Sequence, residues 1–483
     1  MLFADNIKNK LIGDIIMANE KTKALAEKLI YRKKNVFETK SADELAKMMD
    51  FAEDYKNYLD ASKTEREAVS EMIRILKEAG FAEYKLGDSV KAGDKLYYNN
   101  RGKGLFAFNI GTESIENGVR ICASHIDSPR LDMKPVPLFE NDGIGYLKTH
   151  YYGGIRKYQW TTIPLALHGV VTKADGTTVN VTIGEDVGDP VFCISDLLPH
   201  LAQDQNQKKL GEAFTGEGLN IMACSSPYID EDGAVTDEGV KLNVMAMLNE
   251  KYGIVEKDFI SAELTAVPTG KAVDVGLDRW LIGGYGHDDR CCAYPSLRAL
   301  LDNTDSVHTN IMVFADKEEI GSNGATGMRC SLLVDLIDTI SETLGSNGAL
   351  VRSRSLCLSA DVSAAYDPNY PEVYEKRNTA MLHCGVALSK YTGSRGKAGT
   401  NDAPSEYAGF VTGMLDKNDV NWQMVELGRI DQGGGGTVAM FIAESNIDTI
   451  DIGVPVISMH APFEIISKAD LYETYRAFSA FCK

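Results

Sequence analysis

The stretch Gly118-Val-Arg-Ile-Cys-Ala-Ser-His125-Ile-Asp127 places a histidine directly after a run of apolar residues. Within the run, apolar residues alternate with more polar neighbours, which predicts a buried strand that ends at His125. Ligands bind to open α/β sheets outside the carboxyl ends of the strands. The stretch therefore predicts an α/β fold with a functional histidine at one edge of its sheet.

Three further apolar runs end at acidic or histidine side chains. They are Asn310-Ile-Met-Val-Phe-Ala-Asp-Lys-Glu318-Glu319, Ser355-Leu-Cys-Leu-Ser-Ala-Asp361 and Ile450-Asp-Ile-Gly-Val-Pro-Val-Ile-Ser-Met-His460. Asp288 precedes a helix-like stretch from about Cys291 to Leu301 and completes the set. Because the carboxyl ends of strands share one sheet edge, we expect these side chains to converge there.

The residue types favour a dinuclear zinc site. Catalytic zinc takes imidazole nitrogen and carboxylate oxygen, and one position stays open for water or substrate. Two zinc ions about 3.5 to 4 Å apart need a bridging carboxylate. We expect Asp288 to bridge, with His125 and Asp361 on one ion and Glu319 and His460 on the other. Co²⁺ or Mn²⁺ can replace zinc on the same ligands.

Two neighbouring acids complete the predicted chemistry. Glu318, next to a metal ligand, is expected to stay free and to act as the general base that takes a proton from the attacking water. Asp127 is expected to accept the second N–H of the His125 imidazole and so to fix its tautomer. The sequence alone therefore predicts a metallohydrolase.

Composition narrows the class of protein. A chain of 483 residues exceeds what one core usually supports, so at least two domains are expected. A net charge of −19 and a pI near 5.0 argue against nucleic acid and anionic membranes as partners. Nine cysteines without a C-x-x-C pair, and no basic and apolar leader, predict a cytoplasmic protein. A metal role for the adjacent Cys291 and Cys292 is not favoured.

The order of patterns along the chain predicts an insertion. The first 80 residues are helical in pattern, with capping-box spacings at Ser41-Ala-Asp-Glu44 and Thr64-Glu-Arg-Glu67. Between His125 and Asp288 lie 162 residues, far more than a crossover needs. This segment shows β-type alternation around a turn at Lys173-Ala-Asp-Gly-Thr-Thr, which predicts a hairpin. We therefore predict a catalytic domain over 1–132 and 258–483, interrupted by a β-rich domain over 133–257.

The glycine-rich stretches Gly433 to Gly436 and Gly321 to Gly327 lack the lysine of a phosphate-binding loop. Glycine permits close approach of the backbone to a ligand. We expect these loops to let a peptide lie against the main chain.

The residues also resemble a known family, the M18 aminopeptidases, over essentially the full chain. The resemblance is carried by His125-Ile-Asp127-Ser-Pro-Arg-Leu-Asp, Asp316-Lys-Glu318-Glu319-Ile-Gly-Ser322, Ser359-Ala-Asp361-Val-Ser-Ala-Ala-Tyr-Asp-Pro-Asn-Tyr370 and Ser458-Met-His460. It implies a zinc-exopeptidase-like mixed sheet sandwiched by helices, with an inserted β-rich dimerisation domain. It also implies a dinuclear zinc enzyme that removes the N-terminal residue from peptides, and dimers that assemble into a tetrahedral dodecamer.

The resemblance implies two further roles and one departure. His168 matches a histidine of the inserted domain that binds substrate in the partner's active site and stabilises the oxyanion. Lys390 roughly matches a lysine near the specificity pocket, with Arg395 and Lys397 as nearby alternatives. Asp289 stands where aspartyl aminopeptidases usually carry Asn. An acidic and a neutral aliphatic first residue both remain open as the preferred substrate.

Two other classes remain open from the residues. A dinuclear zinc amidase or carboxypeptidase would share the ligands but recognise a carboxylate in place of a free amine. A metal-stabilised assembly protein without catalysis would have no use for a free base such as Glu318, because purely structural zinc sites are closed.

Overall fold

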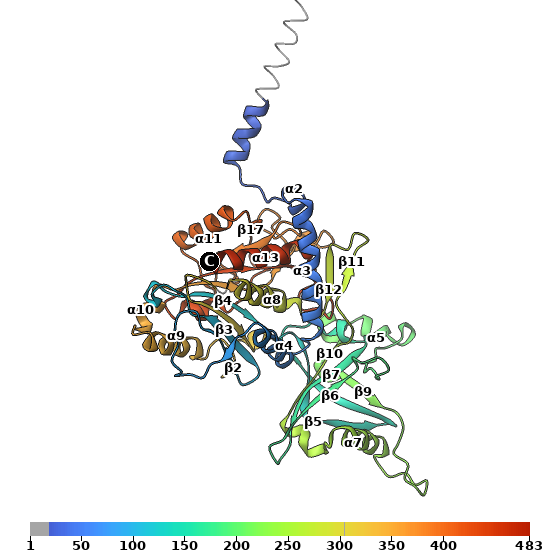
Figure 1. Ribbon diagram of the computed structural model, residues 1–483. Coiled ribbons are helices and arrows are strands. Elements are labelled where there is room, and N and C mark those ends of the chain that lie inside the picture. Colours follow the sequence, from blue (N-terminus) through green and yellow to red (C-terminus); the bar gives the residue numbers. More distant parts are fainter. Residues whose placement is uncertain (1–18, 304) are drawn as a thin grey trace, which may run out of the picture.

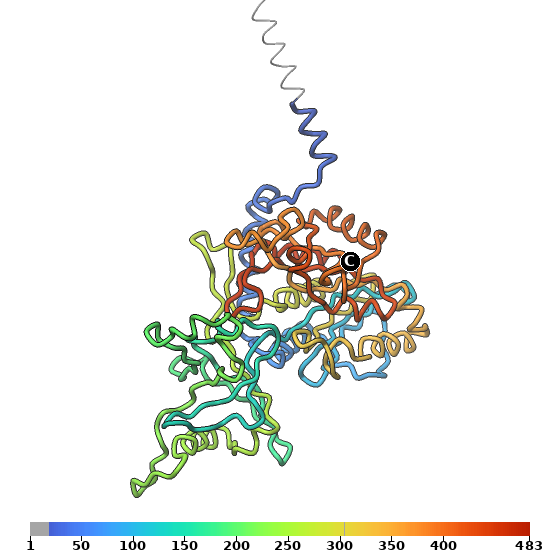
Figure 2. Tube along the Cα trace, turned by 180° about the vertical axis from the view of Figure 1, so that it is seen from behind, coloured from blue at the N-terminus to red at the C-terminus, as the bar shows by residue number. Residues whose placement is uncertain are grey.

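The computed structural model describes residues 19–303 and 305–483. Figure 1 shows a larger part built around a mixed sheet and a smaller part of long antiparallel strands that extends from one side. Residues 19–29 form a helix that projects from the larger part, and the view from behind in Figure 2 shows the same projection. The first 18 of the 80 residues predicted to be helical lie outside the described residues.

The larger part contains a nine-stranded sheet with the order β1-β2-β3-β13-β4-β14-β18-β16-β17. Its four neighbouring strands β13, β4, β14 and β18 run parallel, and strands at both sides of them run antiparallel. The strands are β1 (Ala82–Glu83), β2 (Lys95–Asn100), β3 (Gly104–Asn109), β4 (Arg120–His125), β13 (Asn310–Ala315), β14 (Leu356–Ala360), β16 (Val386–Ser389), β17 (Trp422–Met424) and β18 (Asp448–Gly453).

Helices cover both faces of this sheet, because its central strands are apolar on both sides. One apolar core joins the sheet to α3 (Ala42–Asp60), α4 (Glu65–Glu78), α8 (His287–Asp302), α11 (Ser405–Lys417) and α13 (Lys468–Phe481). A second core on the opposite face joins it to α9 (Leu332–Thr343), α10 (Gly348–Arg352) and α12 (Ala439–Ala443). The predicted mixed sheet sandwiched by helices is confirmed.

The two predicted capping boxes both form. The Ser41 hydroxyl accepts from the backbone N–H of Glu44, whose carboxylate accepts from the backbone N–H of Ser41. Thr64 and Glu67 repeat the arrangement at the start of α4. Each box satisfies backbone donors that the first turn of a helix leaves unpaired, so both helices begin where the sequence predicts.

The smaller part is a six-stranded antiparallel sheet with the order β8-β7-β10-β5-β6-β9. The predicted hairpin is present, with β7 and β8 paired on either side of the Asp-Gly turn. Because β5 and β10 belong to this sheet, it extends past both ends of the segment 133–257. The strands are β5 (Arg130–Asn141), β6 (Ile144–Tyr152), β7 (Leu165–Thr172), β8 (Thr178–Ile183), β9 (Asn220–Cys224) and β10 (Ala262–Pro268).

Short elements complete the two parts. The helix α7 (Gly239–Tyr252) packs on the smaller sheet, and α2 (Val36–Thr39), α5 (Gln203–Asn206) and α6 (Leu210–Ala213) are single turns. The 3-10 turns are η1 (Ile115–Asn117), η2 (Lys157–Trp160), η3 (Pro199–Leu201), η4 (Gly216–Gly218), η5 (Glu256–Ser261), η6 (Glu318–Ile320) and η7 (Pro371–Val373).

A third, five-stranded sheet lies beside the carboxyl edge of the large one. It has the order β11-β12-β20-β19-β15 and is made of β11 (Val273–Val275), β12 (Leu281–Gly284), β15 (Ser363–Ala364), β19 (Pro455–Ile457) and β20 (Glu464–Ser467). The run from Ile450 to His460 was expected to be one strand, and this expectation is wrong. The run leaves the large sheet after Gly453 and continues as β19 of the third sheet.

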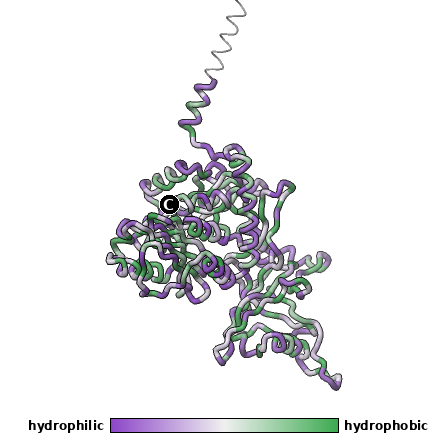
Figure 3. Tube along the Cα trace, viewed as in Figure 1, coloured by the Kyte–Doolittle hydropathy of each residue, from purple (hydrophilic) through white to green (hydrophobic). Residues whose placement is uncertain are grey.

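The physical reason is a close approach at Gly453. A Cβ atom at this position would lie 1.7 Å from the carbonyl oxygen of Asp361, so only glycine allows the two strand ends to meet. No described helix is both long enough and apolar enough to cross a bilayer. Figure 3 shows polar and apolar stretches alternating along both parts of the molecule.

Candidate metal centre

The fold brings all the predicted ligands to one place. His125 is the last residue of β4, and Asp361 follows the last residue of the neighbouring β14. Glu319 lies in η6, just beyond the end of β13. Asp288 lies at the start of α8, where the backbone is still non-helical at Asp288 and Asp289. His460 lies in the turn between β19 and β20.

Asp288 lies between the two histidines. One of its carboxylate oxygens is 3.1 Å from Nε2 of His125, and the other is 3.1 Å from Nε2 of His460. Asp361 is 3.7 Å from the same atom of His125, and Glu319 is 3.5 Å from that of His460. The five side chains therefore form two groups that share Asp288.

Both imidazoles have a fixed tautomer. Nδ1 of His125 is 3.0 Å from the carbonyl oxygen of Asp127, and Nδ1 of His460 is 2.9 Å from that of Gly154. A carbonyl oxygen only accepts hydrogen bonds, so each Nδ1 carries a proton and donates it. Nε2 of both rings then faces the acidic group, where it would offer its lone pair to a bound cation.

The acidic side chains are crowded and buried, which is the condition that a bound cation relieves. Burial and the negative charge of Asp361 raise the pKa of Glu318 to about 8. Burial and the charge of Asp288 raise the pKa of Glu319 and of Asp361 above their usual values. Oε1 of Glu319 is buried without a hydrogen-bond partner among the described residues, and Oδ1 of Asp288 lies 3.1 Å from Nε2 of His125 without a well-directed hydrogen bond. The donor set and its orphaned oxygens fit two divalent cations.

Asp127 holds the turn that carries the two glutamates. Its carboxylate oxygens accept the backbone N–H groups of Glu318 (3.1 Å) and Glu319 (3.2 Å), one on each oxygen. The hydroxyl of Tyr152 donates to the same carboxylate at 2.8 Å. His125 contacts the carbonyl of Asp127 more closely than its carboxylate, which is 3.4 Å away. The side chain of Asp127 therefore positions the glutamate turn more directly than it orients the imidazole.

Glu464 is a functional residue that the sequence analysis missed. Its buried carboxylate accepts the backbone N–H of His460 at 2.7 Å and that of Asp288 at 3.1 Å. It thereby fixes two predicted ligands that lie far apart in the chain. Its position four residues after His460 is the only signal in the sequence, and a single glutamate at that spacing is not specific.

Asp289 and the cysteines after it are also buried. Both carboxylate oxygens of Asp289 lack a hydrogen-bond partner among the described residues, and Asp289, His125 and Asp361 have potential ligand atoms within 4.8 Å of one another. Asp289 is thus part of the acidic group. Burial raises the pKa of Cys291 to about 12 and that of Cys292 well above the usual range. The two thiols and a carboxylate oxygen of Asp289 lie within 4.8 Å of one another.

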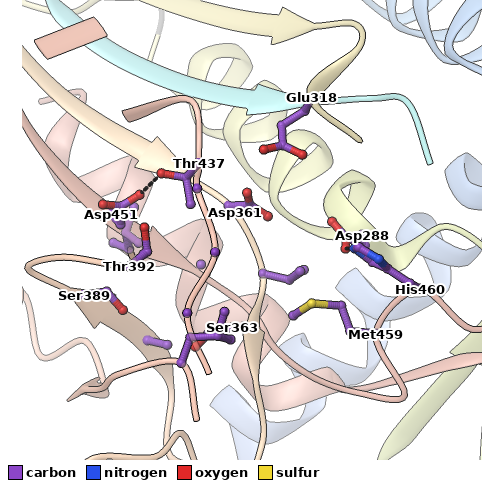
Figure 4. Close-up of a pocket in the computed structure, with 18 residues that line it drawn as sticks. Asp288, Glu318, Asp361, Ser363, Ser389, Thr392, Thr437, Asp451, Met459 and His460 are labelled. Carbon is purple, nitrogen blue, oxygen red and sulfur yellow. Dashed lines mark hydrogen bonds and ion pairs between the residues drawn. The ribbon is translucent and has the colours of Figure 1, made fainter. Parts of the chain in front are cut away.

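A cavity of about 260 Å³ opens beside the ligands. Figure 4 shows Asp288 and His460 on one side of it, Asp361 in the middle, and Asp451 with Thr437 on the far side. Glu318 points toward this space from above. The predicted glycine-rich loop contributes Gly434, Gly435 and Gly436 to the wall.

His168 does not lie at this cavity. It is 2% exposed within β7, and its two ring nitrogens are 2.8 Å from a Glu67 oxygen and 3.1 Å from a Glu185 oxygen. Burial lowers the pKa of His168, but these two hydrogen bonds outweigh burial and raise it to about 9. Both ring nitrogens therefore have partners within the chain, and the role of His168 in a partner's active site stays a prediction.

The lysine expected near the specificity pocket does not line the cavity either. Lys390 is half-buried directly after β16 and is not among the residues of the cavity wall. Arg395 and Lys397 line an adjoining, smaller pocket of about 40 Å³, which shares Thr392, Leu427 and Gly434 with the cavity. Lys397 pairs there with Asp402.

Comparisons with known proteins find similar sequences over most of the chain. The family model described as aminopeptidase I zinc metalloprotease (M18) matches residues 58–482. A probable M18 family aminopeptidase 1 of Clostridium acetobutylicum is 49% identical over 461 residues, 94% of this chain and 98% of its own. One from Thermotoga maritima is 44% identical over 92% of this chain and 98% of its own.

Solved structures of such proteins have the same fold. The crystal structure of an M18 aminopeptidase from Thermotoga maritima superposes with a TM-score of 0.89 at 43% identity, over 94% of this chain and 99% of that one. Aminopeptidase I from Clostridium acetobutylicum gives a TM-score of 0.88 at 45% identity, over 94% of this chain and all of that one. The dodecamer of yeast mApe1 shares the fold with a TM-score of 0.73 at 22% identity, over 89% of this chain and 96% of that one.

Proposed function

The chain belongs to the M18 family of zinc metalloaminopeptidases, and we propose that it is a dinuclear zinc enzyme that removes the N-terminal residue from peptides. The observation that carries the proposal is the position of Asp288, with one carboxylate oxygen facing each histidine at 3.1 Å. His125 and Asp361 would hold one ion, and Glu319 and His460 the other. Bound zinc supplies a Lewis acid that lowers the pKa of water and polarises a carbonyl.

Other residues of the chain transfer the proton and position the ligands. Glu318 extends toward the cavity without a place among the ligands, so it takes the proton of the attacking water and returns it to the departing amine. Asp127 holds Glu318 and Glu319 in position by accepting hydrogen bonds from their backbone N–H groups. Glu464 holds Asp288 and His460 in the same way from the other side.

We also propose that the chain works as a homo-oligomer, with the smaller part as a dimerisation domain and dimers assembled into a dodecamer. The support is a group of exposed apolar side chains around η3, including Leu197 (51% exposed), Leu198 (49%) and Leu201 (68%). Exposed apolar side chains that lie close together commonly mark interfaces between proteins. The mass of the native protein in solution tests this proposal, because a monomeric enzyme with full activity would contradict it.

Hydrolysis of aminoacyl substrates by the zinc-loaded protein tests the activity. Substrates with a free amine should be cleaved, whereas N-acetylated controls should not. If the N-acetylated substrates alone are cleaved, the enzyme is an amidase or carboxypeptidase, and the aminopeptidase proposal fails.

Replacing the base separates catalysis from metal binding. We expect Glu318→Gln to lower kcat by about 10²- to 10⁴-fold, the usual contribution of a general base, while zinc content stays at the wild-type level. Near-normal turnover of this variant would rule out Glu318 as the base. Glu372 is exposed on η7 and offers a matched Glu→Gln control that should leave kcat and zinc content unchanged.

A further inference from the structure

The cavity has a second acidic group, remote from the ligands, that the mechanism does not use. Asp451 lies in β18 and is 3% exposed. Its Oδ1 accepts a hydrogen bond of 2.6 Å from the hydroxyl of Thr437. Its Oδ2 is buried and has no hydrogen-bond partner among the described residues. A buried carboxylate with an unpaired oxygen is costly unless a ligand or a proton satisfies it.

The register of the large sheet aims this carboxylate at the substrate space. Asp451 pairs with Ser359 of β14 on one side and with Ser389 of β16 on the other. Paired residues project from the same face of a sheet, and so do residues two apart in a strand. Asp361, two residues after Ser359, therefore lies on the same face of the sheet as Asp451. One cavity accordingly contains both the metal ligands and Asp451.

The far end of this cavity offers hydroxyl groups and one carboxylate. Ser389, Thr392 and Thr437 line it beside Asp451. No lysine or arginine lines the cavity in the part of the chain that the structure describes. An acidic substrate side chain would meet the Asp451 carboxylate without a protein cation to pair with. An ammonium group has three donors and a positive charge, which match a carboxylate surrounded by hydroxyls.

We propose that Asp451 is a specificity-determining residue and that the enzyme prefers peptides whose first residue carries a positively charged side chain, lysine above all. This inference rests on the proposed aminopeptidase function. The scissile bond lies at the metal ligands, and the side chain of the first residue extends past Asp361 to place its ammonium group on Oδ2 of Asp451. Burial raises the pKa of Asp451 to about 7 in the free protein, and the arriving cation stabilises the charged carboxylate.

The test compares lysyl and norleucyl substrates, because the two side chains have similar length and differ in the terminal ammonium group. The wild-type zinc enzyme should give a kcat/KM for the lysyl substrate at least about 10-fold above that for the norleucyl substrate, because one charge-assisted hydrogen bond contributes a difference of this size. A glutamyl substrate should be the poorest of the three. Asp451→Asn should reduce the lysyl-to-norleucyl ratio by about 10-fold or more.

Asp448→Asn is the matched control, since Asp448 is exposed at the other end of the same strand and does not line the cavity. It should leave the ratio unchanged. A wild-type enzyme that prefers norleucyl or glutamyl substrates, or an Asp451→Asn ratio equal to that of the wild type, would overturn the inference and leave the aminopeptidase proposal intact. Failure to cleave any free-amine substrate would overturn both. The wild-type preference can be measured even if the variant does not fold.

Discussion

Replacing Asp127 with Asn should slow the enzyme without removing its zinc. The Asp127 side chain is fully buried and is not one of the proposed ligands. Its two oxygens each accept a backbone N–H, from Glu318 on Oδ1 and from Glu319 on Oδ2. Asparagine has the same shape but only one acceptor oxygen. Whichever way its amide is oriented, its NH₂ group faces one of the two backbone donors.

The expected decrease in kcat follows from this mismatch between the amide and the backbone donors. The loss of one hydrogen bond to a charged group is worth about 1.5 to 3 kcal/mol. If the displaced turn moves Glu318 in the transition state, kcat falls by about 10- to 150-fold. The amide oriented with oxygen toward Glu319 and Tyr152 keeps two of the three contacts, so the lost contact is the one to Glu318. The variant should therefore affect kcat more strongly than KM.

The assay measures kcat, KM and zinc content of the variant with the preferred free-amine substrate. Asp142→Asn is the matched control, because Asp142 is exposed in the turn between β5 and β6. The control should keep kcat within about two-fold, as surface substitutions usually do. Full kcat in Asp127→Asn, or loss of zinc from it, would refute the positioning role.

Two further changes test the ligand set and the contact between the two parts. Asp288→Asn should remove at least one of the two zinc ions, as measured by metal analysis. It should also abolish the rise in melting temperature that zinc gives the wild-type protein. Full zinc content in this variant would contradict the bridging role of Asp288. His168→Gln should lower stability, because its raised pKa reflects ion pairs with Glu67 and Glu185. These pairs contribute at most about 3 kcal/mol to the free energy of unfolding. The contribution is fully present below the pKa of histidine in the unfolded chain, about 6.5, and is lost as the pH rises through the folded-state pKa of about 9. The loss of melting temperature should thus be larger at pH 6 than at pH 9.5, and an equal loss at both values would contradict the ion pairs.

Several parts of the fold could be predicted from the sequence because they depend on local signals. The two capping boxes and the Asp-Gly hairpin use side chains within a few residues of the backbone groups they satisfy. The strands that end at His125 and before Asp361 follow from apolar runs, and their parallel pairing places both side chains at one edge. A local pattern and a general rule of sheet topology were sufficient for this part of the site.

The remainder depends on contacts between distant segments. The path from Ile450 to His460 changes sheets because Gly453 approaches the carbonyl of Asp361, and no periodicity of the run itself signals such a contact. Glu464 and Asp451 each act through a partner at the site that only the folded chain brings near. His168 was assigned by resemblance, but its environment is set by Glu67 and Glu185, which belong to other elements.

Anomalous diffraction from zinc-loaded crystals, recorded on both sides of the zinc absorption edge, tests the two-ion site most directly. We expect two zinc peaks per chain, separated by about 3.5 to 4 Å, with Asp288 between them. One peak should contact His125 and Asp361, and the other should contact Glu319 and His460. A single peak, or a second peak away from Asp288, would contradict the dinuclear site.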